Sequence, residues 1–145
     1  MQSQDYDNPK VEAHWLREQR AIVEKYLHGE EIRLVGVMEN PIWFIAPYVA
    51  LWKTSELNSG KQKDLWVISG DLPTDYVELS SVQPPREALL CFAKHWKAMS
   101  KEMLKGNFPK SWRTGRLEDQ KDLGDLLERR ANILLDWAAD DQMWQ

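Results

Sequence analysis

The stretch that decides the fold is residues 33–68, RLVGVMENPIWFIAPYVALWKTSELNSGKQKDLWVI. It consists of short apolar runs, rich in β-branched and aromatic residues, that are separated by turn formers such as Asn40-Pro41 and Asn58-Ser59-Gly60. The runs predict strands over residues 33–38, 42–45, 48–53 and 65–68. Because the connections are too short for helical crossovers, we expect a small antiparallel sheet of three to four strands. Pro47 has no N–H to donate, so we expect it at a bulge or on an edge.

Helical patterns flank this stretch on both sides. Asn8 suits an N-cap, Pro9 the first helical position and Gly29 the stop of a helix over residues 9–28. A second helix is expected from Pro85 to about residue 105, and a third over about residues 117–141. The order helix, strands, helix, helix predicts an α+β fold, and the length of 145 residues fits a single globular domain over 1–145.

The composition limits where and how the protein works. There is one cysteine, Cys91, and the N-terminus is polar and acidic, so we expect a cytoplasmic protein without an internal disulfide. The sequence contains no run of eighteen apolar residues, so we expect no membrane span. The net charge of −4 argues against a dedicated DNA-binding protein. Eight tryptophans exceed the needs of a core of this size, so one or two are expected at a binding surface.

The second helix has two contrasting faces. Its apolar residues recur at steps of three and four, and its lysines follow the same steps on the opposite side. The basic residues here and just beyond the helix are Lys94, Lys97, Lys101, Lys105, Lys110, Arg113 and Arg116. This face predicts either a site for phosphate, nucleic acid or an acidic protein, or simply a solvated helix surface, which is the more common role of lysine.

The third helix places Arg130 inside its apolar stripe, where a charge is costly unless it is paired. Arg130 could hold an anion in a pocket, or it could form a structural ion pair with Asp71, Asp75 or Glu12. We hypothesise that it bonds to Asp71 or Asp75 beneath a rim of three aromatic residues. The rim residues are Trp43, Tyr48 and Tyr76. The two aspartates could instead cap the N–H groups of their own turn.

Patterns for common catalytic chemistry are missing from the sequence. The three histidines and Cys91 have no ligand spacing of a zinc site, and no nucleophile elbow, phosphate loop or dinucleotide fingerprint occurs. We therefore predict no catalytic residues, no metal and no cofactor.

The motif Trp66-Val-Ile-Ser-Gly-Asp-Leu-Pro-Thr-Asp-Tyr76 resembles an uncharacterised bacterial family, a domain of unknown function. Residues 41–48, residues 85–88 and the stretch 129–137 are also similar to that family, so the resemblance spans nearly the whole chain. It implies a small cytoplasmic bacterial protein and no particular activity.

The leading hypothesis is a non-enzymatic protein that binds another protein, in one version an immunity-like or antitoxin-like protein that blocks a basic toxin with an acidic surface. The first alternative is a small anionic-ligand binder or enzyme centred on Arg130, Asp71, Asp75 and Tyr76. The second is a nucleic-acid binder that uses the lysine face of the second helix. The sequence does not define the partner or the oligomeric state.

Overall fold

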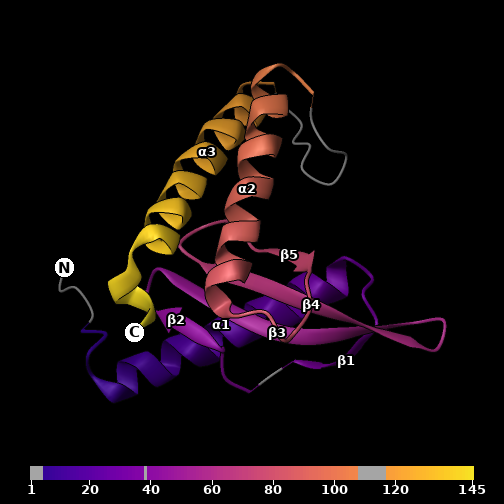
Figure 1. Cartoon of the computed structure of the whole chain (residues 1–145), viewed down its shortest axis with the longest axis vertical. Coiled ribbons are helices and arrows are strands. Elements are labelled where there is room, and N and C mark those ends of the chain that lie inside the picture. The colour runs from indigo at the N-terminus through magenta and orange to yellow at the C-terminus, as the bar shows by residue number, and fades with distance from the viewer. Residues whose placement is uncertain (1–4, 38, 108–116) are drawn as a thin grey trace. The chain divides into compact units, whose positions relative to one another are not determined.

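The computed structural model describes residues 5–37, 39–107 and 117–145 and divides the chain into two compact units, Met1–Pro85 and Arg86–Gln145 (Figure 1). Among the described residues, the first unit, called the sheet unit, contains one helix and the strands. The second, the helical unit, holds the remaining helices. The expectation of one domain over 1–145 stays a prediction. Between them, the units contain the elements of the expected α+β fold, in the expected order.

The sheet unit begins with α1, Pro9–Gly29. The side chain of Asn8 accepts a hydrogen bond of 2.9 Å from the backbone N–H of Lys10, and Pro9 occupies the first helical position. The predicted start of this helix is therefore confirmed. Its buried face consists of Trp15, Gln19, Val23 and Leu27, four residues apart throughout. That spacing places them on one side of the helix.

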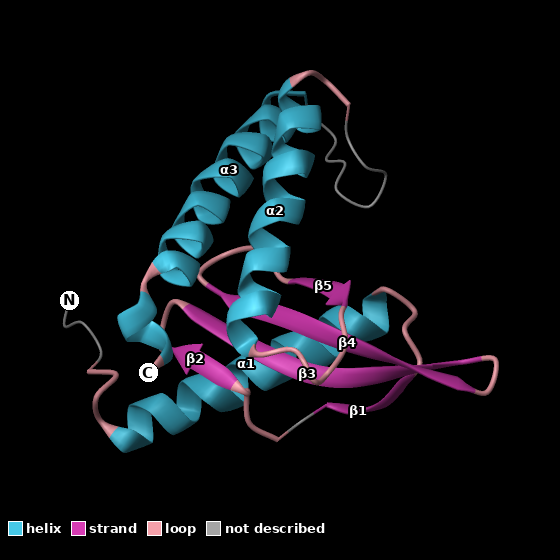
Figure 2. Ribbon diagram, in the orientation of Figure 1, coloured by secondary structure: helices cyan, strands magenta, loops and turns pink. Residues whose placement is uncertain are grey.

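Five strands form one antiparallel sheet (Figure 2). Their bounds are β1 Leu34–Val37, β2 Trp43–Ile45, β3 Val49–Asn58, β4 Lys61–Gly70 and β5 Asp75–Glu78. The main path is β1-β3-β4-β5, and β2 also pairs with β3, beyond the end of β1. The antiparallel sheet is thus confirmed. Pro47 lies in the turn between β2 and β3, where its missing N–H removes no ladder bond.

Two features of the strands differ from expectation. The polar stretch 54–63 is not a broad loop, because β3 and β4 continue through it to a tight turn at Ser59 and Gly60, whose φ angles are 53° and 78°. Those positive angles are typical of two-residue hairpin turns. The segment after the turn-rich residues 70–74 returns to the sheet as β5, a fifth strand beyond the three to four that were expected.

The core of the sheet unit lies where α1 packs on the sheet. Trp52, Leu65 and Val67 from the central strands are buried with Val23 and Leu27 of α1. At the alternate positions of β3 and β4, which lie on the other face of the sheet, the buried residues are Val49, Leu51, Trp66 and Ile68. The buried indoles have hydrogen-bond partners within the unit: Trp52 Nε1 donates to Ser69 Oγ at 3.1 Å, and Trp66 Nε1 donates to the carbonyl of Ser80 at 3.3 Å.

The helical unit contains α2, Pro85–Leu104, α3, Leu117–Ala139, and the short 3-10 helix η2, Asp141–Trp144. The predicted second and third helices are confirmed. Polar contacts join them at both ends: Ser100 Oγ donates to the carbonyl of Gly124 at 2.9 Å, and Arg86 Nε donates to the carbonyl of Ala138 at 2.6 Å. Within the described ranges, no helix is both long and apolar enough to cross a membrane.

Candidate functional site

A cluster of two tyrosines and one aspartate lies where the second half of α1 meets β5. The Tyr26 hydroxyl donates to Asp75 Oδ1 at 3.4 Å, and the same oxygen accepts a 2.9 Å hydrogen bond from the backbone N–H of Tyr76. The rings of Tyr26 and Tyr76 are 6.3 Å apart between centroids, at 57°. Asp75 is 6% exposed, so its carboxylate is buried. The bond to the Tyr76 N–H is a local bond from side chain to backbone within β5.

Three further carboxylates surround this cluster from different elements. Glu30 follows α1, Glu56 lies on β3 and Glu78 ends β5. Glu30 and Glu78 are exposed and Glu56 is half-buried. Lys63 on β4 is the cross-strand neighbour of Glu56 and forms an ion pair of 3.7 Å with Glu78. We call Tyr26, Glu30, Glu56, Asp75, Tyr76 and Glu78 together the tyrosine–carboxylate edge.

The electrostatics of this edge act on both phenols. Burial raises the pKa of Tyr26 far above its usual value, and the nearby Asp75 and Glu30 carboxylates raise it further. Burial also raises the pKa of Tyr76, with added contributions from the surrounding carboxylates, of which Glu30 and Glu56 are the strongest. Each negative charge disfavours a phenolate beside it. Both tyrosines are therefore neutral hydroxyl groups at physiological pH.

The predicted ligand residues of the sheet unit fall into two places. Asp75 and Tyr76 belong to the tyrosine–carboxylate edge. Trp43 lies on β2 and Tyr48 in the turn that follows it; Trp43 is half-buried and Tyr48 is 53% exposed. Asp71 lies close to Tyr48, because its backbone N–H donates to the Tyr48 carbonyl at 3.0 Å. The structure thus brings Asp71 next to Tyr48, and Asp75 next to Tyr76.

Arg130 belongs to the helical unit, on α3, and is half-buried. Its proposed partners Asp71 and Asp75 belong to the sheet unit. The predicted bond between Arg130 and these aspartates therefore stays a prediction, as does the aromatic rim above it.

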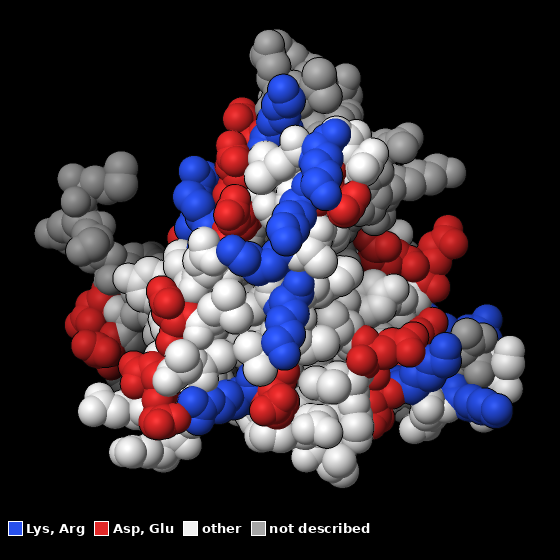
Figure 3. All heavy atoms as spheres, turned by 45° about the horizontal axis from the view of Figure 1, so that its top comes forward, with Lys and Arg blue, Asp and Glu red and all other residues white. Residues whose placement is uncertain are grey.

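The lysine face of α2 is as the periodicity predicts. Lys94, Lys101 and Lys105 are exposed, whereas Phe92, Trp96, Met99 and Met103 are buried on the other side. Figure 3 shows Lys and Arg side chains in a line over the helical unit, with Asp and Glu beside them. Lys97 is partly neutralised by Glu128, at 3.9 Å, and also donates to Asn132 Oδ1 at 2.9 Å. The candidates Lys110, Arg113 and Arg116 lie outside the described residues.

Sequence reasoning missed Tyr26 and the three glutamates of the tyrosine–carboxylate edge. Helical periodicity in the sequence only groups Tyr26 with the apolar residues of α1, and the glutamates are far apart in the chain. Only the pairing of β4 with β5 brings residues 75–78 near the end of α1. Among the described residues, no group of three or more His, Cys, Asp or Glu side chains is arranged to hold a metal ion.

The side chains of the tyrosine–carboxylate edge are suited to binding a ligand or partner and not to nucleophilic chemistry. Neutral phenols beside a buried carboxylate are hydrogen-bond donors, and exposed glutamates attract cations. Cys91, the single thiol, is half-buried, and burial raises its pKa, which makes the reactive thiolate scarce.

Comparison with curated proteins and with solved structures gives no match. Residues 9–144 match the model of one family, whose description is a domain of unknown function, DUF4826. This match covers nearly the whole chain and agrees with the resemblance seen in the sequence. The chain belongs to the family of proteins that share this domain of unknown function, DUF4826.

Proposed function

We propose that this protein is a non-enzymatic binding protein whose tyrosine–carboxylate edge docks on a basic surface of a partner protein. The observation that carries the proposal is the position of Tyr76, a partly buried ring flanked by carboxylates from the end of α1, β3 and β5. Tyrosine supplies a large rigid contact area, and surrounding charge of one sign selects a partner of the opposite sign.

The net charge of the sheet unit also favours a basic partner. Residues 1–85 contain eight Lys and Arg against thirteen Asp and Glu, a net charge of −5, whereas residues 86–145 contain eleven against ten, a net charge of +1. The acidic balance of the whole chain therefore comes from the sheet unit. Such a field raises the association rate with a basic partner and makes binding sensitive to salt.

In the version that we favour, the protein acts in the bacterial cytoplasm as an immunity-like or antitoxin-like protein. Its acidic edge would cover the basic, substrate-binding surface of a toxin. Toxins that act on nucleic acids carry such basic surfaces because phosphate binding needs concentrated positive charge.

A charge-reversal experiment tests the proposal. The wild-type protein, the double variant Glu30→Lys/Glu78→Lys and the control Glu18→Lys/Glu24→Lys are each tagged and purified from their native host. Both doubles change the net charge equally, and the control residues lie on α1 outside the tyrosine–carboxylate edge. We expect wild type and control to retain the same stoichiometric basic protein, and the edge variant to lose it. Equal retention by both doubles would refute the proposed docking surface.

A further inference from the structure

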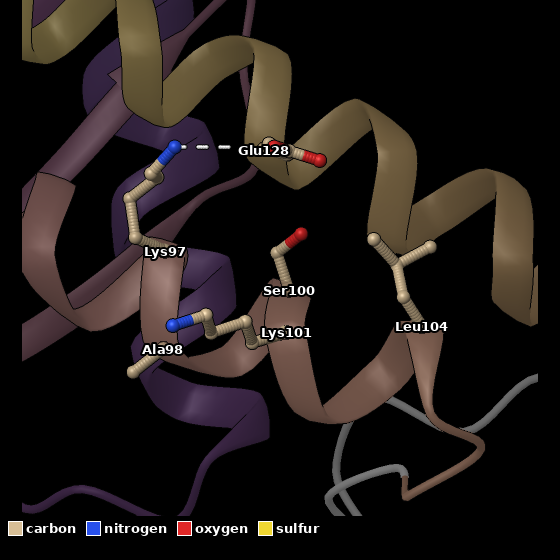
Figure 4. Close-up of a pocket in the computed structure, with 6 residues that line it drawn as sticks. All are labelled: Lys97, Ala98, Ser100, Lys101, Leu104 and Glu128. Atoms are coloured by element: carbon tan, nitrogen blue, oxygen red, sulfur yellow. Dashed lines mark ion pairs between the residues drawn. The ribbon is translucent and has the colours of Figure 1, made fainter.

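The helical unit has a pocket on the side of α2 where its lysines approach α3 (Figure 4). Its volume is about 350 Å³. The lining residues are Lys97, Ala98, Ser100, Lys101, Leu104 and Glu128. The volume lies at the lower end of the range of small-molecule sites, which is about 300–1,000 Å³. The pocket lies in a different unit from the tyrosine–carboxylate edge, so its role is independent of the function proposed above.

The wall of the pocket is mainly apolar. Ala98 and Leu104 contribute aliphatic surface, and Leu104 is 43% exposed although it is a large hydrophobic residue. The hydroxyl of Ser100 is buried and already donates to the Gly124 carbonyl. Figure 4 shows Ser100 and Leu104 pointing from α2 toward α3. An occupant would therefore gain from burying apolar surface here, with few hydrogen bonds to the wall.

Charged groups stand at the same pocket. Lys97 reaches toward Glu128 in Figure 4, and their charged atoms are 3.9 Å apart. Lys101 has no ion pair with any described residue, and its side chain runs back along α2 in the direction of Ala98. Two lysines and one glutamate give a local charge of +1. Lys97 and Glu128 offset each other, which leaves the exposed ammonium of Lys101 available to an anionic group of a ligand.

We propose that this pocket binds a small amphipathic monocarboxylate, with its hydrocarbon part against Ala98 and Leu104 and its carboxylate on the Lys101 ammonium. A single negative charge matches the local charge of +1, whereas a dianion such as a phosphate monoester would face Glu128 with an unbalanced charge. The apolar wall distinguishes this ligand from a small inorganic anion, which would gain nothing from it.

Nuclear magnetic resonance titration of the full ¹⁵N-labelled chain with octanoate tests this site. Ligands of this size bind with a Kd of about 1 mM, which the method measures well. We expect saturable shifts of the amides of Lys97, Lys101, Leu104 and Glu128. Lys101→Met should weaken binding about fivefold, because it removes one partly exposed ion pair. Ala98→Phe should abolish binding by filling the pocket.

Lys94→Met is the matched control, since it removes an exposed lysine of the same helix that does not line the pocket. It should leave the Kd of octanoate unchanged, and octylammonium should not bind. All three substituted residues, Lys94, Ala98 and Lys101, are exposed, so folding is not at risk. The proposal is overturned if octanoate gives no saturable shifts up to several times the expected Kd. It is also overturned if Lys94→Met weakens binding as much as Lys101→Met, or if octylammonium binds equally well.

Discussion

Gly70 sits inside the family-like motif and is held in a conformation that other residues rarely adopt. Its φ is +135°, and a Cβ built there would lie 2.3 Å from the Tyr48 carbonyl oxygen and 2.9 Å from the Val49 Cα. Real Cβ atoms do not approach backbone atoms so closely. The same Tyr48 carbonyl accepts the hydrogen bond from the Asp71 N–H at 3.0 Å. A side chain at position 70 must therefore displace the β3 start or break that bond.

The expected cost of Gly70→Ala follows from two contributions. The unfavourable backbone conformation costs about 1–3 kcal/mol. Moving the Tyr48 carbonyl and losing its hydrogen bond to the Asp71 N–H adds about 0.5–1.5 kcal/mol. The sum is a loss in the free energy of unfolding of about 1.5–4.5 kcal/mol. It is measured by urea denaturation followed through tryptophan fluorescence, to which the buried Trp52 and Trp66 contribute.

Gly60→Ala is the control, because Gly60 has a φ of +78° but nothing within 4 Å of an added Cβ. Gly60→Ala should lose only the free energy that the unfavourable backbone conformation costs, about 1–2 kcal/mol. If Gly70→Ala destabilises no more than Gly60→Ala does, the close approach of Gly70 to Tyr48 is refuted.

Three other predictions concern stability. In the folded state Tyr26 keeps its proton above its usual pKa of 10.0. The stability that this protonated hydroxyl contributes is therefore complete below pH 10 and is lost as pH rises further. Tyr26→Phe should flatten the alkaline fall in the free energy of unfolding relative to wild type. Trp52→Phe leaves buried Ser69 without its indole donor and should cost about 2–4 kcal/mol in urea denaturation, and a loss under about 1 kcal/mol would contradict this. Arg86→Met should speed amide exchange around Ala138 and η2, whereas Asp141→Asn should change it little because that carboxylate is 83% exposed.

Local signals in the sequence predicted most of the fold. Asn8 and Pro9 fix the start of α1, and Gly60 supplies the positive φ that closes the β3–β4 hairpin. These are short-range effects that one residue type can determine. The length of that hairpin was underestimated, because its polar residues lie in an exposed extension where burial no longer produces an apolar pattern.

The candidate site was only partly predictable for a different reason. Asp75 and Tyr76 stand out in the sequence because they directly follow a dense cluster of turn formers. The same cluster hides β5, which has only four residues and begins at Asp75. Tyr26 and Asp75 are 49 residues apart, and their contact cannot be predicted unless β5 is recognised as a strand of the sheet. Sites made by long-range strand pairing leave no local spacing for the sequence to reveal.

The measurement that tests the proposed function most directly is site-specific photocrosslinking in the native host. A photoreactive phenylalanine analogue replaces Tyr76 at the tyrosine–carboxylate edge or, as a control, Leu57, an exposed residue near the tip of the β3–β4 hairpin. The account predicts one dominant adduct with a basic protein at position 76, lost at high salt, and none of it at position 57. The absence of a protein adduct at position 76, or the same adducts at both positions, would contradict the account.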